Sequence, residues 1–423
     1  MKFLTRWRVR LHGAVDGAFH DLSGERRRCD AKCHYTADTV WWAAVLAFAT
    51  RRGSLLGNDM MRDSAAMPST LWALSGQPEA GTEGACVPCA DTVRYWLSAV
   101  RPELLDKVLL SCAEWMARSK LFDGGRLRGR FVIAVDGSKQ ESRRASRPDG
   151  ADGNRMVLRA SVIMRGFALP LMTEPLGAYA GEAGKRDCEL AALRRLAKRL
   201  KEAFPRLPIC LAGDALYACA PVFAMCAGDG WRYIATFREG RGSARYAEAE
   251  ALMAANPENG GKWPREAGAR RARKGRLRWA EDVEMGGFCV NVVHCTETRP
   301  GHYDGMFATD LPVGDVRSAA EVAIRGRMRW NIESSFHVQK NGGYGMEHNF
   351  CDDDACSRNL HTAMQVAYFL CEVFLKCLAR PKVANCGKLP HVRIIDMIVA
   401  VMRTRPVADP GPGWENLHSY APG

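Results

Sequence analysis

Three acidic residues lie in settings that would suit the binding of metal ions. Asp136 closes the apolar segment FVIAVD (131–136), and Asp214 closes LPICLAGD (207–214). Glu333 belongs to the charged segment RWNIESSFHVQKNGGYGMEHNF (329–350). Carboxylates that come together repel one another unless they hold a cation, and hard oxygen ligands favour Mg²⁺ or Mn²⁺. Taken alone, each acid is more simply explained as a turn residue or a helix cap.

The late charged segment predicts a helix with one charged face. Four of its residues follow one another at intervals of four, four and three positions, namely Arg329, Glu333, His337 and Lys340. Side chains at these intervals lie along one stripe of a helix. We expect this helix to run from about Ser318 to Lys340, with Asp315 as its cap and Asn341-Gly342-Gly343 at its end. A face of surface ion pairs is the alternative explanation for the arginine and the lysine.

The middle of the chain predicts a layered α/β domain that would bring the acids together. Short apolar segments alternate with helix-forming ones in the order β-β-β-α-β-α-β. After FVIAVD they are a hairpin of 156–165 and 167–174, a helix from Glu189 to Ala203 capped by Asp187, the strand 207–214, a helix near 219–227 and the strand 231–237. Strand ends converge at one edge of such a sheet, which is where ligands usually bind. We therefore expect Asp136 and Asp214 to lie close together, with Lys185 and Glu174 as weaker candidates near them.

The 423 residues exceed one ordinary core, and changes in composition suggest several units. These are a helical N-terminal DNA-binding domain (1–128), an α/β core (129–239 and 313–380), a β-rich insertion (240–312), and a C-terminal helix with a loose tail (381–423). The longest apolar run, 40–49, is far shorter than the roughly 20 residues of a membrane helix. Sixteen dispersed cysteines favour reduced thiols in a cytoplasm.

The net charge of +13 favours a polyanionic partner such as nucleic acid. A basic cluster in the insertion strengthens this expectation: Arg270, Arg271, Arg273, Lys274, Arg276 and Arg278. Trp263 and Trp279 flank it, and bases could stack on their rings while the charges bind phosphates. A solvated loop is the alternative. A zinc site from Cys29, Cys33, His34, Cys86 and Cys89 is a weaker possibility, with plain reduced thiols as the alternative.

The motifs resemble those of DDE transposases of bacterial insertion sequences. VDGSK (135–139) is similar to the first Asp motif, and KRDCE (185–189) with GDALYA (213–218) is similar to the segments around the second. Arg329, Glu333 and Lys340 fit the signature Tyr-x2-Arg-x3-Glu-x6-Lys of one large group, although Gly326 stands in the tyrosine position. The resemblance covers roughly residues 25–375, and the Glu segment is its most specific part.

This resemblance implies a fold, a reaction and a set of roles. The fold would be a ribonuclease-H-like mixed sheet with flanking helices, a β-rich insertion before the last catalytic helix and an all-α N-terminal domain. Asp136, Asp214 and Glu333 would be catalytic and would bind two Mg²⁺ or Mn²⁺ ions. Arg329 and Lys340 would contact DNA near the cut, and Trp330 could replace the missing tyrosine.

The resemblance also implies partners. A homodimer would bind double-stranded DNA at terminal inverted repeats, cleave it and join the 3′-hydroxyl ends to target DNA, in a bacterial nucleoid and without a membrane. Two alternatives remain open: a nuclease that cuts without joining, and a DNA-binding derivative without catalysis.

Overall fold

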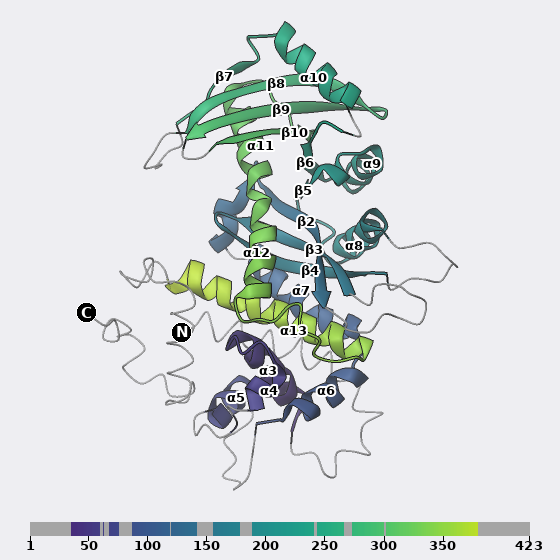
Figure 1. Ribbon diagram of the computed structural model, residues 1–423, viewed down its shortest axis with the longest axis vertical. Coiled ribbons are helices and arrows are strands. Elements are labelled where there is room, and N and C mark those ends of the chain that lie inside the picture. The colour runs from purple at the N-terminus through teal and green to yellow at the C-terminus, as the bar shows by residue number, and fades with distance from the viewer. Residues whose placement is uncertain are drawn as a thin grey trace, which may run out of the picture.

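The centre of the molecule is a ten-stranded mixed sheet with helices packed around it (Figure 1). The computed structural model describes residues 35–59, 62, 67–75, 87–118, 120–141, 155–177, 188–240, 243–265, 273–299 and 302–379. The strand order is β4-β3-β2-β5-β6-β10-β9-β8-β7, and β1 pairs with β2 beside this path. The predicted α/β class is therefore confirmed.

The predicted core strands form as expected. β2 (Arg130–Glu141), β3 (Arg155–Met164) and β4 (Phe167–Leu176) form an antiparallel meander. β5 (Ile209–Gly213) lies parallel to β2, and β6 (Arg232–Phe237) lies parallel to β5. Every residue of β5 is buried, as a parallel strand covered on both faces requires.

Helices α8 (Glu189–Ala203) and α9 (Ala220–Asp229) complete the predicted β-β-β-α-β-α-β order. α8 buries an apolar stripe that contacts β3 and β4. Its N-cap is Cys188, so the prediction that Asp187 caps this helix is wrong; Asp187 itself lies outside the described residues. Gly230 caps the C-terminus of α9, and its φ of 69° is in the left-handed region that glycine adopts without strain.

The predicted insertion extends the same sheet. Its strands are β7 (Gly260–Lys262), β8 (Lys274–Met285), β9 (Phe288–Arg299) and β10 (Tyr303–Thr309). β10 pairs antiparallel with β6, so the hydrogen-bonded ladder continues from the core without a break. A helix that the sequence did not predict, α10 (Ser243–Ala255), packs on β8.

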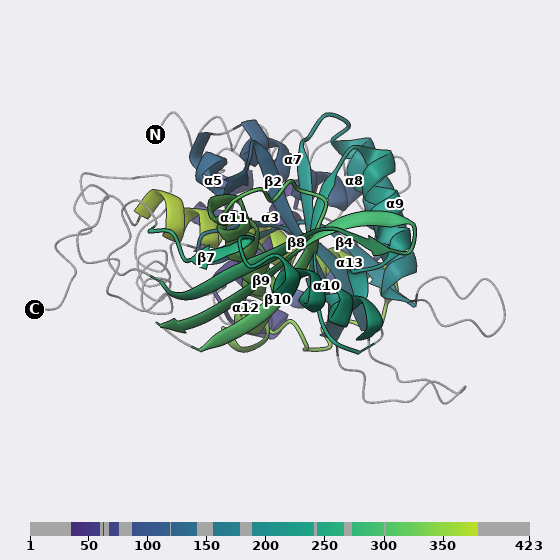
Figure 2. The same ribbon diagram turned by 90° about the horizontal axis from the view of Figure 1, so that it is seen from above.

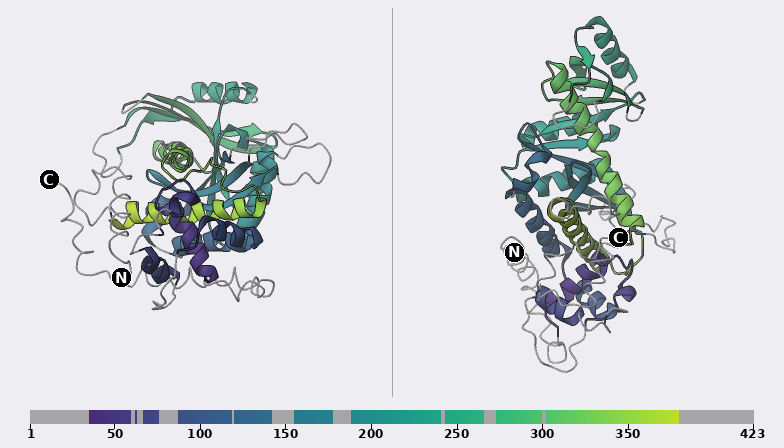
Figure 3. Two further views of the ribbon diagram at one scale, coloured as in Figure 1. Left: turned by 60° about the horizontal axis from the view of Figure 1, so that its bottom comes forward. Right: turned by 90° about the vertical axis from the view of Figure 1, so that its left-hand side faces the viewer.

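The late helix is divided in two. α11 (Val316–Met328) starts with a capping box between Asp315 and Ser318, which confirms the predicted cap. α12 (Trp330–Asn341) follows directly: Arg329 between them keeps helical φ and ψ of −50° and −35°, and its N–H donates to Gly326 three residues back in a tighter turn. Figure 2 shows α8 and α9 on one side of the sheet and α11 on the other, and Figure 3 shows α11 and α12 running along the molecule.

Helix α13 (Asp354–Val373) joins the N-terminal helices to the sheet. It begins at Asp354 because Asp353 caps it by accepting from the N–H of Cys356. It contacts β4 and also α3 (Ala37–Ala49), α6 (Ala90–Ala99) and α7 (Pro102–Arg118). A short six-residue π-helical segment, Phe374–Ala379, follows it.

The remaining N-terminal elements are short and helical, apart from one two-residue strand. They are α4 (Leu55–Asp59), α5 (Met67–Ser75), a 3₁₀ turn (Lys120–Gly125) and β1 (Arg126–Leu127). The predicted helical character of this region holds for the residues described. None of the described helices has the length and apolar character needed to cross a membrane.

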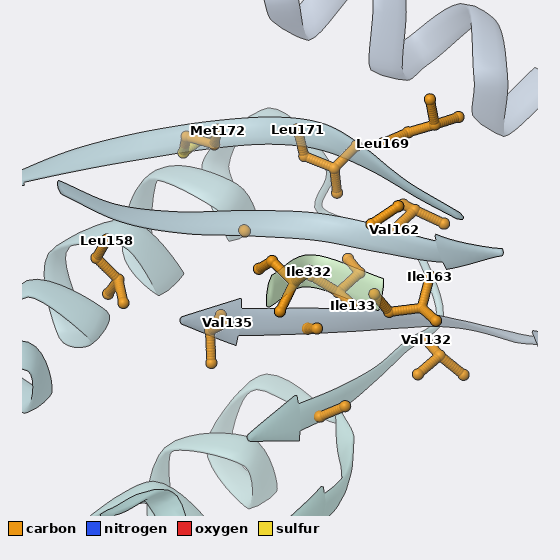
Figure 4. Packing of buried hydrophobic residues seen from close by; sticks show 14 of the residues in the cluster. Val132, Ile133, Val135, Leu158, Val162, Ile163, Leu169, Leu171, Met172 and Ile332 are labelled. Carbon is orange, nitrogen blue, oxygen red and sulfur yellow. The ribbon is translucent and has the colours of Figure 1, made fainter. Parts of the chain in front are cut away.

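The core closes around the strands that carry the candidate site. Figure 4 shows Ile332 of α12 among the buried side chains of β2, β3 and β4. Ile133 on β2 and Val162 on β3 are cross-strand partners in this layer, and both are fully buried. α12 is therefore anchored on the sheet one residue before Glu333.

Candidate active site

Asp136 and Asp214 occupy matching positions on neighbouring parallel strands. The last parallel pair of β2 and β5 is Ala134 with Ala212, and each acid lies two residues beyond it. The prediction that Asp136 ends its strand is wrong, because β2 continues to Glu141 by pairing with β3. The parallel ladder nevertheless stops before Asp136, so both acids reach the same edge, as the sequence predicted.

Asp214 is held by the turn that follows its strand. Its Oδ1 accepts from the N–H of Leu216 at 2.9 Å and caps the 3₁₀ turn Ala215–Tyr217. The ring of Tyr217 folds back onto Gly213, where a Cβ would lie 2.7 Å from the tyrosine. Tyr217 is buried, and its hydroxyl donates to Glu189 Oε2 at 2.9 Å.

Glu189 is a fourth acid of the site, although in the sequence it is only the first residue of a predicted helix. It begins α8, which returns to the strand edge after the β3–β4 hairpin. A Cβ at Gly137 would collide with its carboxylate, so the glycine after Asp136 leaves room for it. The acid at the start of α8 and the Asp-Gly pair on β2 can be connected only once the structure shows that the two segments meet.

Glu333 lies in the first turn of α12 and is paired with Arg329. Arg329 Nη2 donates to Glu333 Oε1 at 2.6 Å. The arginine is 4% exposed, and its Nε and Nη1 find no acceptor among the described residues. Arg329 thus lies behind the acid as a buried countercharge and has little surface to offer to a phosphate.

Lys340 and His337, two other residues of the predicted charged face, already contact neighbouring side chains. Lys340 Nζ pairs with Glu347 Oε1 at 2.8 Å, and its side chain is partly buried. His337 is exposed, and its Nδ1 lies 3.1 Å from Asn341 Nδ2. Trp330 is 56% exposed and remains open to a partner.

The structure gives a physical reason for the glycine in the tyrosine position of the signature. Gly326 lies in α11, where a Cβ would be 2.5 Å from the ring of Phe307 on β10. A tyrosine side chain would therefore meet the sheet. In this chain Phe307 fills the space that a side chain at position 326 would need.

Asp214, Glu333 and Glu189 all lie near enough to Asp136 to act on its ionisation. Burial raises the pKa of Asp136 to about 6, and Arg329 opposes this rise. Glu333, Asp214 and Glu189 raise the same pKa further by charge repulsion. With the side chains as placed, no three acid, histidine or cysteine groups in the described ranges surround one metal position. The acids are thus close enough to repel, and Glu333 is turned toward its arginine.

The basic cluster of the insertion is less available than the sequence suggested. Arg273 pairs with the buried Glu297, which Arg327 also contacts. Lys274 is exposed on β8, as is the nearby Arg276. Arg270 and Arg271 lie outside the described residues.

The predicted stacking role of the two flanking tryptophans is wrong. Trp263 and Trp279 are 7% and 4% exposed, and the indole N–H of Trp263 donates to Thr296 O at 2.8 Å. Both rings pack in the core of the insertion, so neither presents a face to a base.

The weaker candidates are structural or outside the described residues. Glu174 is buried and accepts from Arg195 and Arg199, which tie β4 to α8. Cys89 Sγ contacts the hydroxyl of Thr92, and hydrogen bonds from Thr92 lower the pKa of this thiol. Lys185 lies outside the described residues. So do the zinc candidates other than Cys89, namely Cys29, Cys33, His34 and Cys86.

Comparison with known proteins adds no relative. No protein-family model matches the chain, and no curated protein matches it. Function is therefore argued from the site itself.

Proposed function

We propose that the chain is a metal-dependent enzyme that cleaves and joins DNA, a transposase of the DDE group with a ribonuclease-H-like core. One observation carries the proposal: acids from four elements lie near one another, and burial together with repulsion from the other three raises the pKa of Asp136 to about 6. Such a cluster opposes folding, and strongly perturbed acids of this kind concentrate at functional sites. The net charge of +13 suits a polyanionic substrate.

The residues fit a divalent cation. Carboxylate oxygens are the donors that Mg²⁺ and Mn²⁺ prefer, and a cation would remove the repulsion around Asp136. Asp136, Asp214 and Glu333 would hold the metal, with Glu189 beside them. When bound, two such ions supply activation of the attacking oxygen and stabilisation of the leaving oxygen in phosphoryl transfer.

The chain's own groups orient these acids. The N–H of Leu216 holds Asp214, the hydroxyl of Tyr217 holds Glu189, and Arg329 holds Glu333. Fixed carboxylates lower the entropy cost of assembling the reaction. Trp330, which is exposed at the start of α12, would contact DNA near these acids, and Lys340 lies farther along the same helix. Two copies of the chain would bring two DNA ends together.

Cleavage of supercoiled plasmid carrying the DNA that flanks the chain's own gene tests this proposal. Wild type, Glu333→Gln and Glu281→Gln would be compared with Mg²⁺ or Mn²⁺, since Glu281 is an exposed acid of the insertion. We expect metal-dependent cutting by wild type and by Glu281→Gln, and none by Glu333→Gln, which should still bind DNA. Equal cutting by Glu333→Gln would exclude this site.

A pre-cleaved DNA end separates the two catalytic possibilities. Joining of its 3′-hydroxyl to a second plasmid supports the transposase. Cutting without joining would leave a nuclease with the same site, and tight binding without either would leave a DNA-binding protein.

A further inference from the structure

Arg159 on β3 is a fully buried cation without a carboxylate partner. Its Nη1 donates to Gln365 Oε1 at 3.0 Å, and its Nη2 donates to the carbonyl of Ile332 at 3.4 Å and to Ser335 Oγ. Its guanidinium carbon lies 3.9 Å from the centre of the Phe336 ring. Within the described residues every acceptor that it contacts is neutral, and its Nε has none.

A buried charge without an ion pair opposes folding. Burial lowers the pKa of Arg159 to about 10, so the guanidinium remains charged at neutral pH. The groups whose negative charge would favour the cation are Tyr368 and Asp136. Burial raises the pKa of Tyr368, so this phenol is neutral; Asp136 is the other group that favours the charged Arg159, without an ion pair between them.

The sheet register explains how Arg159 reaches the site. Asp136 on β2 and Arg159 on β3 are direct cross-strand partners, so both side chains leave the same face of the sheet. The contacts of Arg159 with Ile332 and Ser335 lie on either side of Glu333 along α12. One side chain therefore links the strand position opposite the first acid to the helix turn that carries the last.

A second layer of hydrogen bonds keeps this link in place. Gln365 of α13, which accepts from Arg159, exchanges hydrogen bonds with Gln339 of α12 at 2.9 and 3.3 Å. Asn331, at the start of α12, donates to the carbonyl of Met164 at the end of β3 at 2.8 Å. These contacts hold α12 against β3 and α13.

We propose that Arg159 is a positioning residue of the acid site: it sets the distance between Asp136 and Glu333 by clamping α12 to the strand beside β2. The inference rests on the proposed metal-dependent function. Arg159 does not touch the metal or the DNA, and it acts through the placement of Glu333.

Measurements of Mn²⁺ affinity distinguish a positioning role of Arg159 from an effect of its charge and from an effect on the stability of the protein. Free Mn²⁺ would be titrated by electron paramagnetic resonance in wild type, Arg159→Met, Arg159→Lys and Glu333→Gln, with thermal unfolding recorded for each. Loss of the positive charge alone would tighten cation binding. Loss of positioning should weaken Mn²⁺ binding in Arg159→Met roughly tenfold or more, the range seen when supporting residues of metal sites are removed. Arg159→Lys keeps the charge and part of the contacts, so a smaller loss of Mn²⁺ affinity is expected. If Arg159→Met does not fold, Arg159→Lys provides the test.

Arg199→Met is the matched control. Arg199 is another arginine clamp, joining α8 to Glu174 and Asp106. We expect this variant to lose thermal stability but to bind Mn²⁺ as wild type does. Unchanged or tighter Mn²⁺ binding in the folded Arg159 variants would overturn the positioning role while leaving the proposed function intact. Wild-type Mn²⁺ binding that Glu333→Gln does not reduce would overturn the proposed function, and the inference with it.

Discussion

Replacing Asp136 by asparagine should stabilise the protein in the absence of metal while it abolishes cleavage. Burial and three neighbouring acids raise the pKa of Asp136 from 3.8 to about 6. Ionisation of this carboxylate therefore costs free energy in the folded state, and asparagine, which is close in shape, does not ionise. The native residue is retained at the expense of stability, as is common at sites built for a ligand.

The magnitude follows from the pKa. A rise of about 2 units, from 3.8 to about 6, corresponds to a ceiling of about 3 kcal/mol, at 1.36 kcal/mol per unit. Asp136 is not completely buried, so about 1–2 kcal/mol is the working expectation after screening by solvent. The folded state binds the extra proton between about pH 4 and pH 6, so wild-type stability falls as the pH rises through this range. The advantage of Asp136→Asn should be absent below pH 4 and complete above pH 6.

Urea unfolding at pH 4 and pH 8 with a chelator measures this difference. Added Mn²⁺ should stabilise wild type at pH 8 and reverse the order of the two proteins. Asp315→Asn is a control of opposite sign, because hydrogen bonds from Ser318 lower the pKa of Asp315, so loss of its charge should not stabilise. An Asp136→Asn variant that is less stable than wild type at pH 8 without metal would refute the reasoning. So would equal stabilisation of both proteins by Mn²⁺.

Three further substitutions probe the surroundings of the site. Gly137→Ala should push the carboxylate of Glu189 aside and reduce cleavage, measured on plasmid, with little change in thermal unfolding because only the end of a side chain must move. Gly326→Ala should lower the free energy of unfolding in urea by about 1–3 kcal/mol, because its Cβ would crowd the ring of Phe307. Glu174→Gln should cost roughly 3 kcal/mol, since it removes the charge that two arginines share, but should leave Mn²⁺ affinity unchanged.

Local signals predicted most of what surrounds the first two acids. Continuous apolar runs gave the strands of the core, and the glycine at position 166 gave the hairpin between β3 and β4. The capping box at Asp315 and Ser318 is also a local pattern, because both partners lie within one turn. The position of Asp214 could be predicted from its own strand alone. Each of these features depends on residues that are near one another in the sequence.

Features that depend on packing between distant segments could not be predicted in this way. Trp263 and Trp279 lie beside a basic stretch, which suggested exposure, yet the pairing of β8 with β7 and β9 buries both rings. Glu189 resembles any acid in a first helical turn until the space beside Gly137 is known. Nothing in its own segment shows that α8 starts at the strand edge.

The charged face of α12 shows what the spacing of residues in the sequence can and cannot predict. The intervals between Arg329, Glu333 and Lys340 correctly place them on one stripe, but they give no information on depth. Depth is set by tertiary packing: Arg159 of β3 donates to the carbonyl of Ile332 in the first turn of α12, and Gln365 of α13 pairs with Gln339 near its end. The first residue of the stripe is consequently 4% exposed, whereas Lys340 ends in a partly exposed ion pair. An arginine that is buried against its own acid has a different role from one that binds DNA: its hydrogen bond holds the carboxylate of Glu333 in place.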